Sequence, residues 1–221
     1  MGTDNLFHKR KAKSIQDLRR RKAKKEAYEK ILIVCEGEKT EPSYFSEIKD
    51  KHELNSANID IVGDCDSCPT AIVEFAKKKY KEEKDLGDPY DKVFCVFDRD
   101  THAKYESAIT LANKSKPSDT FVIINSVPCF EYWLILHFDF RTRPYSPLPG
   151  KSMGQQIISE LKQFLPNYSK GDNTIFSQTE SQLQFAKANA SRGLKQAQRN
   201  NTDNPSTKIH ILVEYLENLK K

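Results

Sequence analysis

Residues 31–45 read ILIVCEGEKTEPSYF, and the fold of the chain can be predicted by working outward from this stretch. Its first five residues are apolar without a break, as in a parallel strand that is buried on both faces of a sheet. Glu36, Glu38 and Glu41 follow directly after the strand. Carboxylates crowded in this way repel one another and cost free energy unless a cation joins them. The stretch therefore predicts a buried strand that ends in a chemically active segment.

Short apolar runs alternate with helical stretches as far as residue 126. Beyond the first run we predict strands at 58–63, 92–97 and 120–126, with helices at 41–53, 69–84 and about 105–114 between them. Strands that are apolar throughout and alternate with helices are typical of a parallel sheet covered on both faces. The sequence therefore predicts a three-layer α/β fold with a mainly parallel sheet of about four strands.

The pattern changes after residue 128. An aromatic-rich helix is expected at 128–138, followed by a proline-laden loop at 141–150 and helices at about 152–165, 179–198 and 206–219, without a further strand. We therefore predict three parts: a basic N-terminal arm (1–29), an α/β domain (30–140) and a helical appendage packed on it (141–221).

Positive charge is concentrated at the N-terminus. The chain has a net charge of +5, and residues 1–30 contain eleven Lys or Arg against four acids, or +7, which leaves −2 for the remainder. Such an arm is either a solvated tail or a contact for nucleic acid or an acidic partner. No apolar run approaches the roughly 18 residues of a membrane span, and none resembles a signal peptide, so we expect a cytoplasmic protein. Cys65 and Cys68 form an isolated CDSC without the second pair of a zinc site.

Acidic side chains follow two of the predicted strands. Glu36 ends the first strand beside Gly37, which would permit a positive φ, and Asp98 and Asp100 end the strand of 92–97. Residues two apart in an extended backbone share a face, and the carboxyl ends of parallel strands meet at one edge of the sheet. Each acid alone could be an ordinary loop residue. Together they form the oxygen donor set that holds Mg²⁺, for which Mn²⁺ can substitute.

The Glu-Gly and Asp-x-Asp pair resembles the Toprim domain of topoisomerases, primases and OLD-type nucleases. The segments CEGEKTEPSYF, FDRDTH, NSVPCFEYWLILHF and NPSTKIHILVEYL resemble, more narrowly, the RloB-like family, from about residue 30 to the end of the chain. Val127 departs from the asparagine expected before the proline in that family.

The resemblance implies a Mg²⁺-dependent nuclease of bacterial defence loci, acting on DNA or on RNA such as tRNA and controlled by a partner ATPase. Glu36 would act as general acid or base or hold metal, while Asp98 and Asp100 would hold Mg²⁺. Glu41, rather than Glu38, would be the better candidate for a second metal. Whether the chain forms a homo-oligomer stays open.

Further candidates lie outside these motifs. Glu131 follows a strand end and a proline, so we expect it near the same edge of the sheet, whereas His137 is expected in the core on the opposite side of the helix. For several polar residues a functional role and a solvated surface position both stay open: Lys39 and His102 beside the acids, and Lys170 and Arg192 in the appendage.

Three tempting motifs fail. PGKS at 149–152 lacks the glycine of a phosphate-binding loop, because that position is Tyr145, and DRDT at 98–101 has His102 where a phosphatase needs threonine. No GxSxG of a serine hydrolase is present. The alternative functions are a catalytically silent adaptor that binds nucleic acid or the ATPase, and, with less support, primase-like synthesis.

Overall fold

The structure is a computed structural model that describes residues 29–54, 58–63, 68–99 and 104–219. Its centre is a sheet in the order β2-β1-β3-β4-β5. The first four strands, β1 (Ile31–Cys35), β2 (Ile59–Val62), β3 (Lys92–Asp98) and β4 (Phe121–Val127), are parallel. The predicted parallel α/β fold is therefore confirmed, with strand ends that differ from the expected ones by at most one residue.

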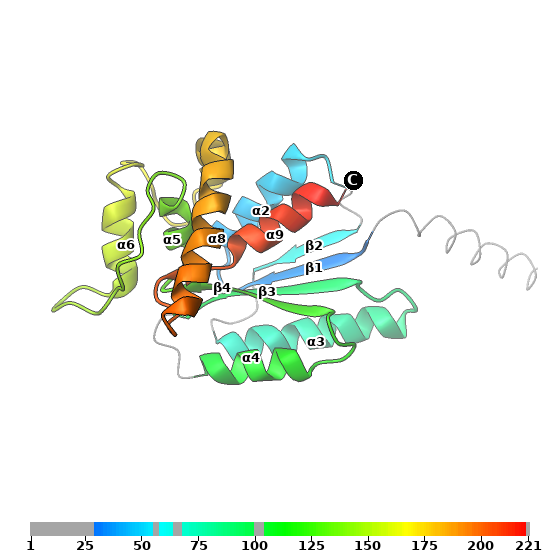
Figure 1. Cartoon of the computed structure of the whole chain (residues 1–221). Helices are drawn as coiled ribbons and strands as arrows, with labels where there is room; N and C mark the ends of the chain where they lie inside the picture. Colours follow the sequence, from blue (N-terminus) through cyan, green and yellow to red (C-terminus); the bar gives the residue numbers. More distant parts are fainter. Residues whose placement is uncertain (1–28, 55–57, 64–67, 100–103, 220–221) are drawn as a thin grey trace, which may run out of the picture.

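Helices cover both faces of the sheet, which gives the expected three layers (Figure 1). One layer contains α3 (Pro69–Asp85) and α4 (Tyr105–Lys114), and the other contains α2 (Thr40–Lys51) and α9 (Ile209–Asn218). Side chains of β1 alternate between the layers: Leu32 and Val34 pack with α3, while Ile31 and Ile33 pack with α2. The strand is apolar throughout because both of its faces are buried.

The C-terminal helices are present, but the segment also returns to the sheet. The structure places α5 (Glu131–Ile135), α6 (Met153–Leu161), α7 (Ile175–Thr179), the 3₁₀ turn η1 (Glu180–Gln182) and α8 (Leu183–Arg199) before β5 (Ser206–Thr207). The prediction of no further strand was wrong, because β5 pairs antiparallel with β4. Two polar residues contain no apolar run by which a strand could be recognised. Their pairing partner is distant in the chain: the hydroxyls of Ser126 and Thr207 lie 2.9 Å apart across 81 residues.

Helix ends also differ from the prediction. The aromatic helix is limited to α5 and continues as a turn, and α6 ends at Leu161. The helix expected at 206–219 begins only at Ile209, since β5 occupies its first residues. Within the described ranges, no helix is both long and apolar enough to cross a lipid bilayer.

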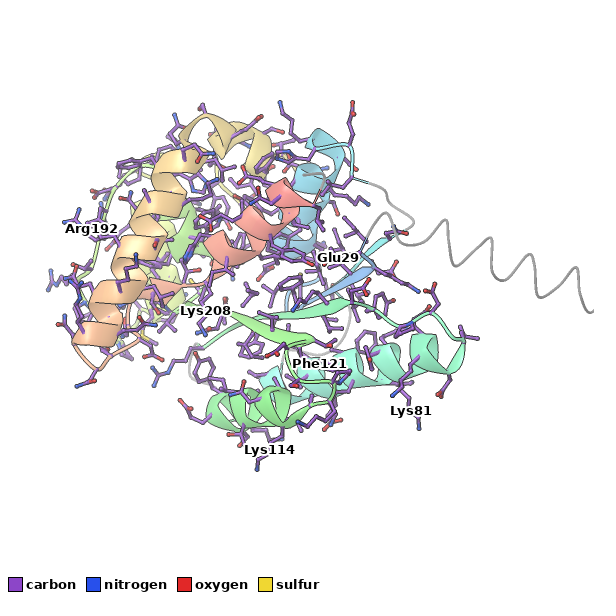
Figure 2. The ribbon with its side chains drawn as sticks, turned by 45° about the vertical axis from the view of Figure 1, so that its right-hand side comes forward. Glu29, Lys81, Lys114, Phe121, Arg192 and Lys208 are labelled. Carbon is purple, nitrogen blue, oxygen red and sulfur yellow. The ribbon has the colours of Figure 1, made fainter. Side chains whose placement is uncertain are left out.

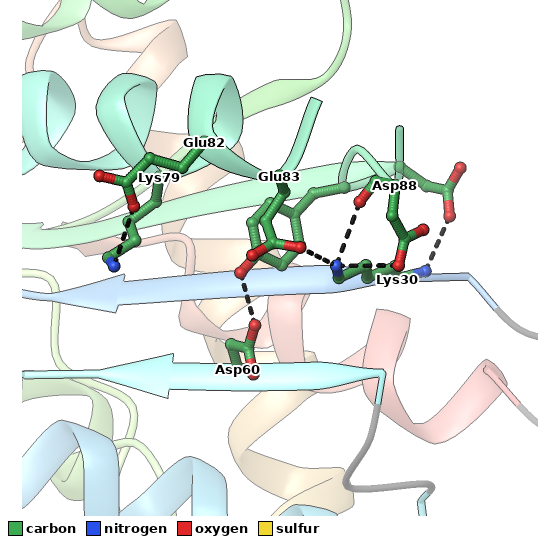
Figure 3. A network of polar contacts seen from close by, with 8 residues as sticks. Lys30, Asp60, Lys79, Glu82, Glu83 and Asp88 are labelled. Carbon is green, nitrogen blue, oxygen red and sulfur yellow. Dashed lines mark hydrogen bonds and ion pairs between the residues drawn. The ribbon is translucent and has the colours of Figure 1, made fainter. Parts of the chain in front are cut away.

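Lys30 anchors the amino end of β1 through a network of polar contacts (Figure 3). Its ammonium group pairs with Glu83 at 2.5 Å and with Asp88 at 3.2 Å, and it lies 4.9 Å from the centre of the Tyr90 ring. The Tyr90 hydroxyl in turn donates to Asp60 of β2. These contacts tie the end of α3 and the turn before β3 to the beginning of the sheet.

Candidate functional site

A cavity of about 370 Å³ lies beyond the carboxyl ends of β1 and β3. Five carboxylates line it, together with two lysines; the acids are Glu36, Glu38, Glu41, Asp98 and Glu131, and the lysines are Lys39 and Lys170. These residues come from the end of β1, from α2, β3 and α5, and from the loop after α6. The position agrees with the general rule that ligands of parallel α/β sheets bind beyond the carboxyl ends of the strands.

Glu36 and Asp98 meet because β1 and β3 are neighbours in register. Cys35 pairs with Val96, and the backbone N–H of Glu36 continues the ladder by donating to the Val96 carbonyl at 2.9 Å. The Glu36 carboxylate then accepts a hydrogen bond of 2.8 Å from the backbone N–H of Asp98. The sequence-based expectation that these two acids share one edge is therefore met by the structure.

Glu41 reaches the cavity from the first turn of α2 and is 9% exposed. Its carboxylate packs against Gly37: a Cβ added at Gly37 would lie 2.2 Å from Glu41 Oε2. Gly37 is not among the glycines with positive φ, so the expected reason for a glycine at this position was wrong. The absence of a Cβ at Gly37 leaves room for the Glu41 carboxylate in this position.

Glu131 is the first residue of α5 and is 3% exposed. The Tyr168 hydroxyl donates to its Oε1 at 3.1 Å, and the Lys170 ammonium lies 3.5 Å from the same oxygen. The backbone N–H of Gly171 donates to the Thr40 hydroxyl at 2.9 Å. The loop 168–171 therefore crosses from the C-terminal segment to α2 and closes one side of the cavity.

Burial and mutual repulsion shift the acidity of the cluster. Burial raises the pKa of Glu41 to about 7, and the negative charges of Glu131 and Glu36 act in the same direction. Burial also raises the pKa of Asp98 well above its usual range, and the other three carboxylates add to the effect. Lys170 opposes the shift at Glu41, but its side chain is 68% exposed. The cluster thus holds more negative charge than its surroundings neutralise.

The donor chemistry suits a hard divalent cation, since all the acids offer carboxylate oxygens. Among the described residues, however, no three Asp, Glu, His or Cys side chains are placed so as to hold one ion. The acids share a cavity without converging on a single point. Asp100, the third predicted metal ligand, lies outside the described residues, as does His102.

The remaining sequence candidates divide between the cavity and the rest of the molecule. Lys39 and Lys170 both line the cavity, whereas Arg192 lies on α8, where its guanidinium stacks over the ring of Phe140 at 4.2 Å. His137 is buried against Trp133 and its Nδ1 lies 3.1 Å from the Trp133 carbonyl oxygen. Burial lowers the pKa of His137 to about 4, as expected for a neutral core histidine.

Sequence reasoning missed Tyr168 and Gly171 as parts of the site. Gly171 has a φ of +84°, a conformation that favours glycine, and a Cβ there would lie 3.1 Å from the Lys39 side chain. The motif YSKGD at 168–172 indicates a turn, but nothing in it indicates which part of the fold the turn contacts.

Comparison with known proteins identifies one family. The family model described as RloB-like protein matches residues 31–216, which include every described residue of the cavity. No curated protein and no solved structure matches the chain.

Proposed function

The chain belongs to the RloB-like family, and from this premise we propose that it is a metal-dependent phosphodiesterase of Toprim type that hydrolyses nucleic acid. One observation supports the proposal most strongly. Glu36, Glu41, Asp98 and Glu131 come from four different elements to line one cavity, and burial with mutual repulsion raises the pKa of Glu41 and Asp98. Such a cluster costs stability, which is typical of a site kept for chemistry.

We assign the acids to a Mg²⁺ site in which Glu36, Asp98 and Asp100 hold the ion and Glu41 and Glu131 lie beside it. A bound Mg²⁺ would polarise the scissile phosphate and stabilise the charge that develops on it. The alternative role for Glu36 is general acid or base, because a carboxylate at the cavity can exchange a proton with a reacting group. The hydrogen bond that it accepts from the Asp98 N–H would orient it for either role. Both roles predict loss of activity when Glu36 is neutralised.

Lys39 and Lys170 add positive charge to the cavity that the acids line. The Lys170 ammonium lies 3.5 Å from Glu131, and the lysine side chain is 68% exposed, so it can contact a phosphate oxygen while it stays beside Glu131. An acid cluster that can hold a metal ion, placed beside positive groups that can contact phosphate oxygens, is typical of sites that act on phosphate esters. The cavity offers both, which favours a phosphate ester over an uncharged substrate.

On the family resemblance we extend the proposal to a nuclease of bacterial defence that a partner ATPase controls. DNA and RNA, including tRNA, both carry the phosphate groups that the proposed site would bind. The choice between them requires a cleavage assay with each substrate.

The proposal is tested first by calorimetry with Mn²⁺ in place of Mg²⁺. Glu36→Gln and Asp98→Asn should lose the binding that the unmodified chain shows. Glu106→Gln, an exposed acid on α4, should retain it and serves as the control. Cleavage of labelled DNA and tRNA is then measured with the ATPase present. Equal Mn²⁺ binding by all four proteins, or none by any, would refute the metal site and favour the adaptor.

A further inference from the structure

The helices α3 and α8 have the same length but very different charge. Both contain 17 residues. In α3 five lysines are interleaved with four acids, and two of the lysines, Lys77 and Lys79, pair with Glu74 and Glu82. In α8 four basic residues occur without any acid, and the acid-free stretch extends from Ser181 to Thr202. A solvated helix normally mixes both signs, so the composition of α8 calls for another explanation.

The basic residues of α8 form one exposed stripe. Phe185, Ala188, Arg192, Lys195 and Arg199 are exposed and follow one another at intervals of three or four residues. This spacing places them on one face of the helix. The buried face consists mainly of small residues, among them Ala186, Ala190 and Gly193. Figure 2 shows Arg192 at the outer side of this helix, away from the sheet.

The cations of the stripe are available to a partner. Lys187, which lies off the stripe, pairs with Glu217 at 2.6 Å. Within the part of the chain that the structure describes, Arg192, Lys195 and Arg199 form no ion pair. Arg192 is held by stacking on Phe140, which leaves its N–H donors for hydrogen bonds. Phe185, which is 50% exposed, adds an aromatic surface to the same face.

The stripe belongs to a helix that abuts the proposed catalytic elements. The Asn189 side chain donates to the Leu136 carbonyl at 2.9 Å, just after α5, the helix that begins with Glu131. Beyond the other end of α8, Asp203 pairs with Arg99, the residue after Asp98. The helix that carries the stripe is therefore packed, through its buried face, on the elements that hold the carboxylate cluster.

We propose that the exposed face of α8, defined by Phe185, Arg192, Lys195 and Arg199, binds the phosphate backbone of a nucleic acid. From Arg192 to Arg199 the helix rises about 10 Å, which corresponds to about three phosphate spacings along one strand of a duplex. The inference rests on the proposed function, since it assigns the surface that holds the substrate. It concerns binding alone and needs neither metal nor cleavage.

The test uses the full chain and a fluorescein-labelled oligonucleotide in EDTA, with anisotropy read over a series of NaCl concentrations. The first variant combines Arg192→Gln, Lys195→Gln and Arg199→Gln. The matched control combines Lys77→Gln, Lys78→Gln and Lys81→Gln on α3, which removes the same charge from a helix of the same length. The α8 variant should bind on the order of tenfold more weakly or worse, and its salt dependence should fall by about two to three released counterions. The α3 variant should bind like the unmodified chain.

Circular dichroism and thermal unfolding establish that both variants are folded. An equal loss in both variants, no loss in the α8 variant, or no binding by the unmodified chain would overturn the proposal. Displacement of the oligonucleotide by poly-L-glutamate at equal charge concentration would also overturn it, because the face would then suit an acidic protein segment. The α8 variant should keep Mn²⁺ binding, so calorimetry separates a failure of this surface from a failure of the metal site.

Discussion

At the amino ends of the strands, Lys30 contacts two carboxylates, a backbone carbonyl and an aromatic ring, whereas at the carboxyl ends several acids share a cavity with only partial neutralisation. The Lys30 side chain is 13% exposed and surrounded by partners of opposite sign. The pKa of Glu41 and Asp98 is raised instead, mainly by burial and then by neighbouring negative charge. At the amino ends of the strands the charge is thus neutralised by neighbouring groups, whereas at the carboxyl ends negative charge is only partly neutralised.

This difference separates stability from function. The paired charges around Lys30 stabilise the fold, whereas a cluster of buried acids with little neutralisation is typical of a site that binds a ligand. Neutralising a charge should consequently have opposite effects at the two ends. The predictions below test this contrast.

Asp98→Asn should have the largest effect. Loss of a metal-holding carboxylate should lower cleavage on the order of 10³-fold, as measured with labelled nucleic acid under single-turnover conditions. The free energy of unfolding in EDTA should rise, because a buried and repelled negative charge is removed. Undiminished cleavage by a folded Asp98→Asn chain would contradict a functional role for the acids at the carboxyl ends of the strands.

Lys30→Met should act in the opposite direction. It leaves Glu83 and Asp88 without their cation, and since both are partly exposed, we expect a loss of about 1–3 kcal/mol in the free energy of unfolding by urea. Cleavage by the folded variant should not change. Lys79→Met, which breaks the more exposed pair with Glu82, should cost less than about 0.5 kcal/mol. If the two variants were equally stable, the Lys30 network would be no more than a surface pair.

The stability of the metal-free chain should fall between pH 5 and pH 8 because of Glu41. Its pKa is about 7 in the folded chain against an ordinary value of 4.5, so the folded chain binds the proton more tightly than the unfolded chain. The contribution is fully present below pH 4.5 and is lost as the pH rises through 7. Urea denaturation should show a loss of about 1–3 kcal/mol from this group. The loss should shrink in Glu41→Gln, and an identical pH profile in both proteins would contradict it.

Lys170→Met should change the stability of the folded chain only slightly. The pair with Glu131 is largely exposed on the lysine side, so its loss should cost less than about 1 kcal/mol. Mn²⁺ should bind a few-fold more tightly by calorimetry, because a competing positive charge leaves the cavity. Lys170→Arg keeps the charge and serves as the control. Weaker Mn²⁺ binding in the methionine variant would show that Lys170 supports the metal site.

Part of the site could be predicted from the chain because it depends on local pattern. The apolar run ILIVC is typical of a strand buried on both sides, and Glu36 follows it directly. The run before Asp98 has the same character, and two such strands in parallel place their ends together. The sequence thus predicted the shared edge, and the neighbouring position of β1 and β3 in the sheet added the direct contact of Glu36 with Asp98.

Other parts of the site depend on contacts between residues far apart in the chain. Gly171 meets Thr40 across 131 residues, and Tyr168 meets Glu131 across 37. Neither contact has a periodic pattern, because each involves a single side chain or backbone group in a loop. The strand β5 was missed for the same reason: its two residues are defined only by β4.

The sequence by itself determined the parallel sheet, the edge at which its acids gather and the acid-free charge of α8, because these follow from the order and period of residues along the chain. Only the tertiary structure decided that Glu41 packs on Gly37, that Lys170 and Tyr168 reach Glu131, and that Lys30 is surrounded by acids. The pKa of a carboxylate depends on burial and on every charge nearby, and neither is a property of its neighbours in sequence.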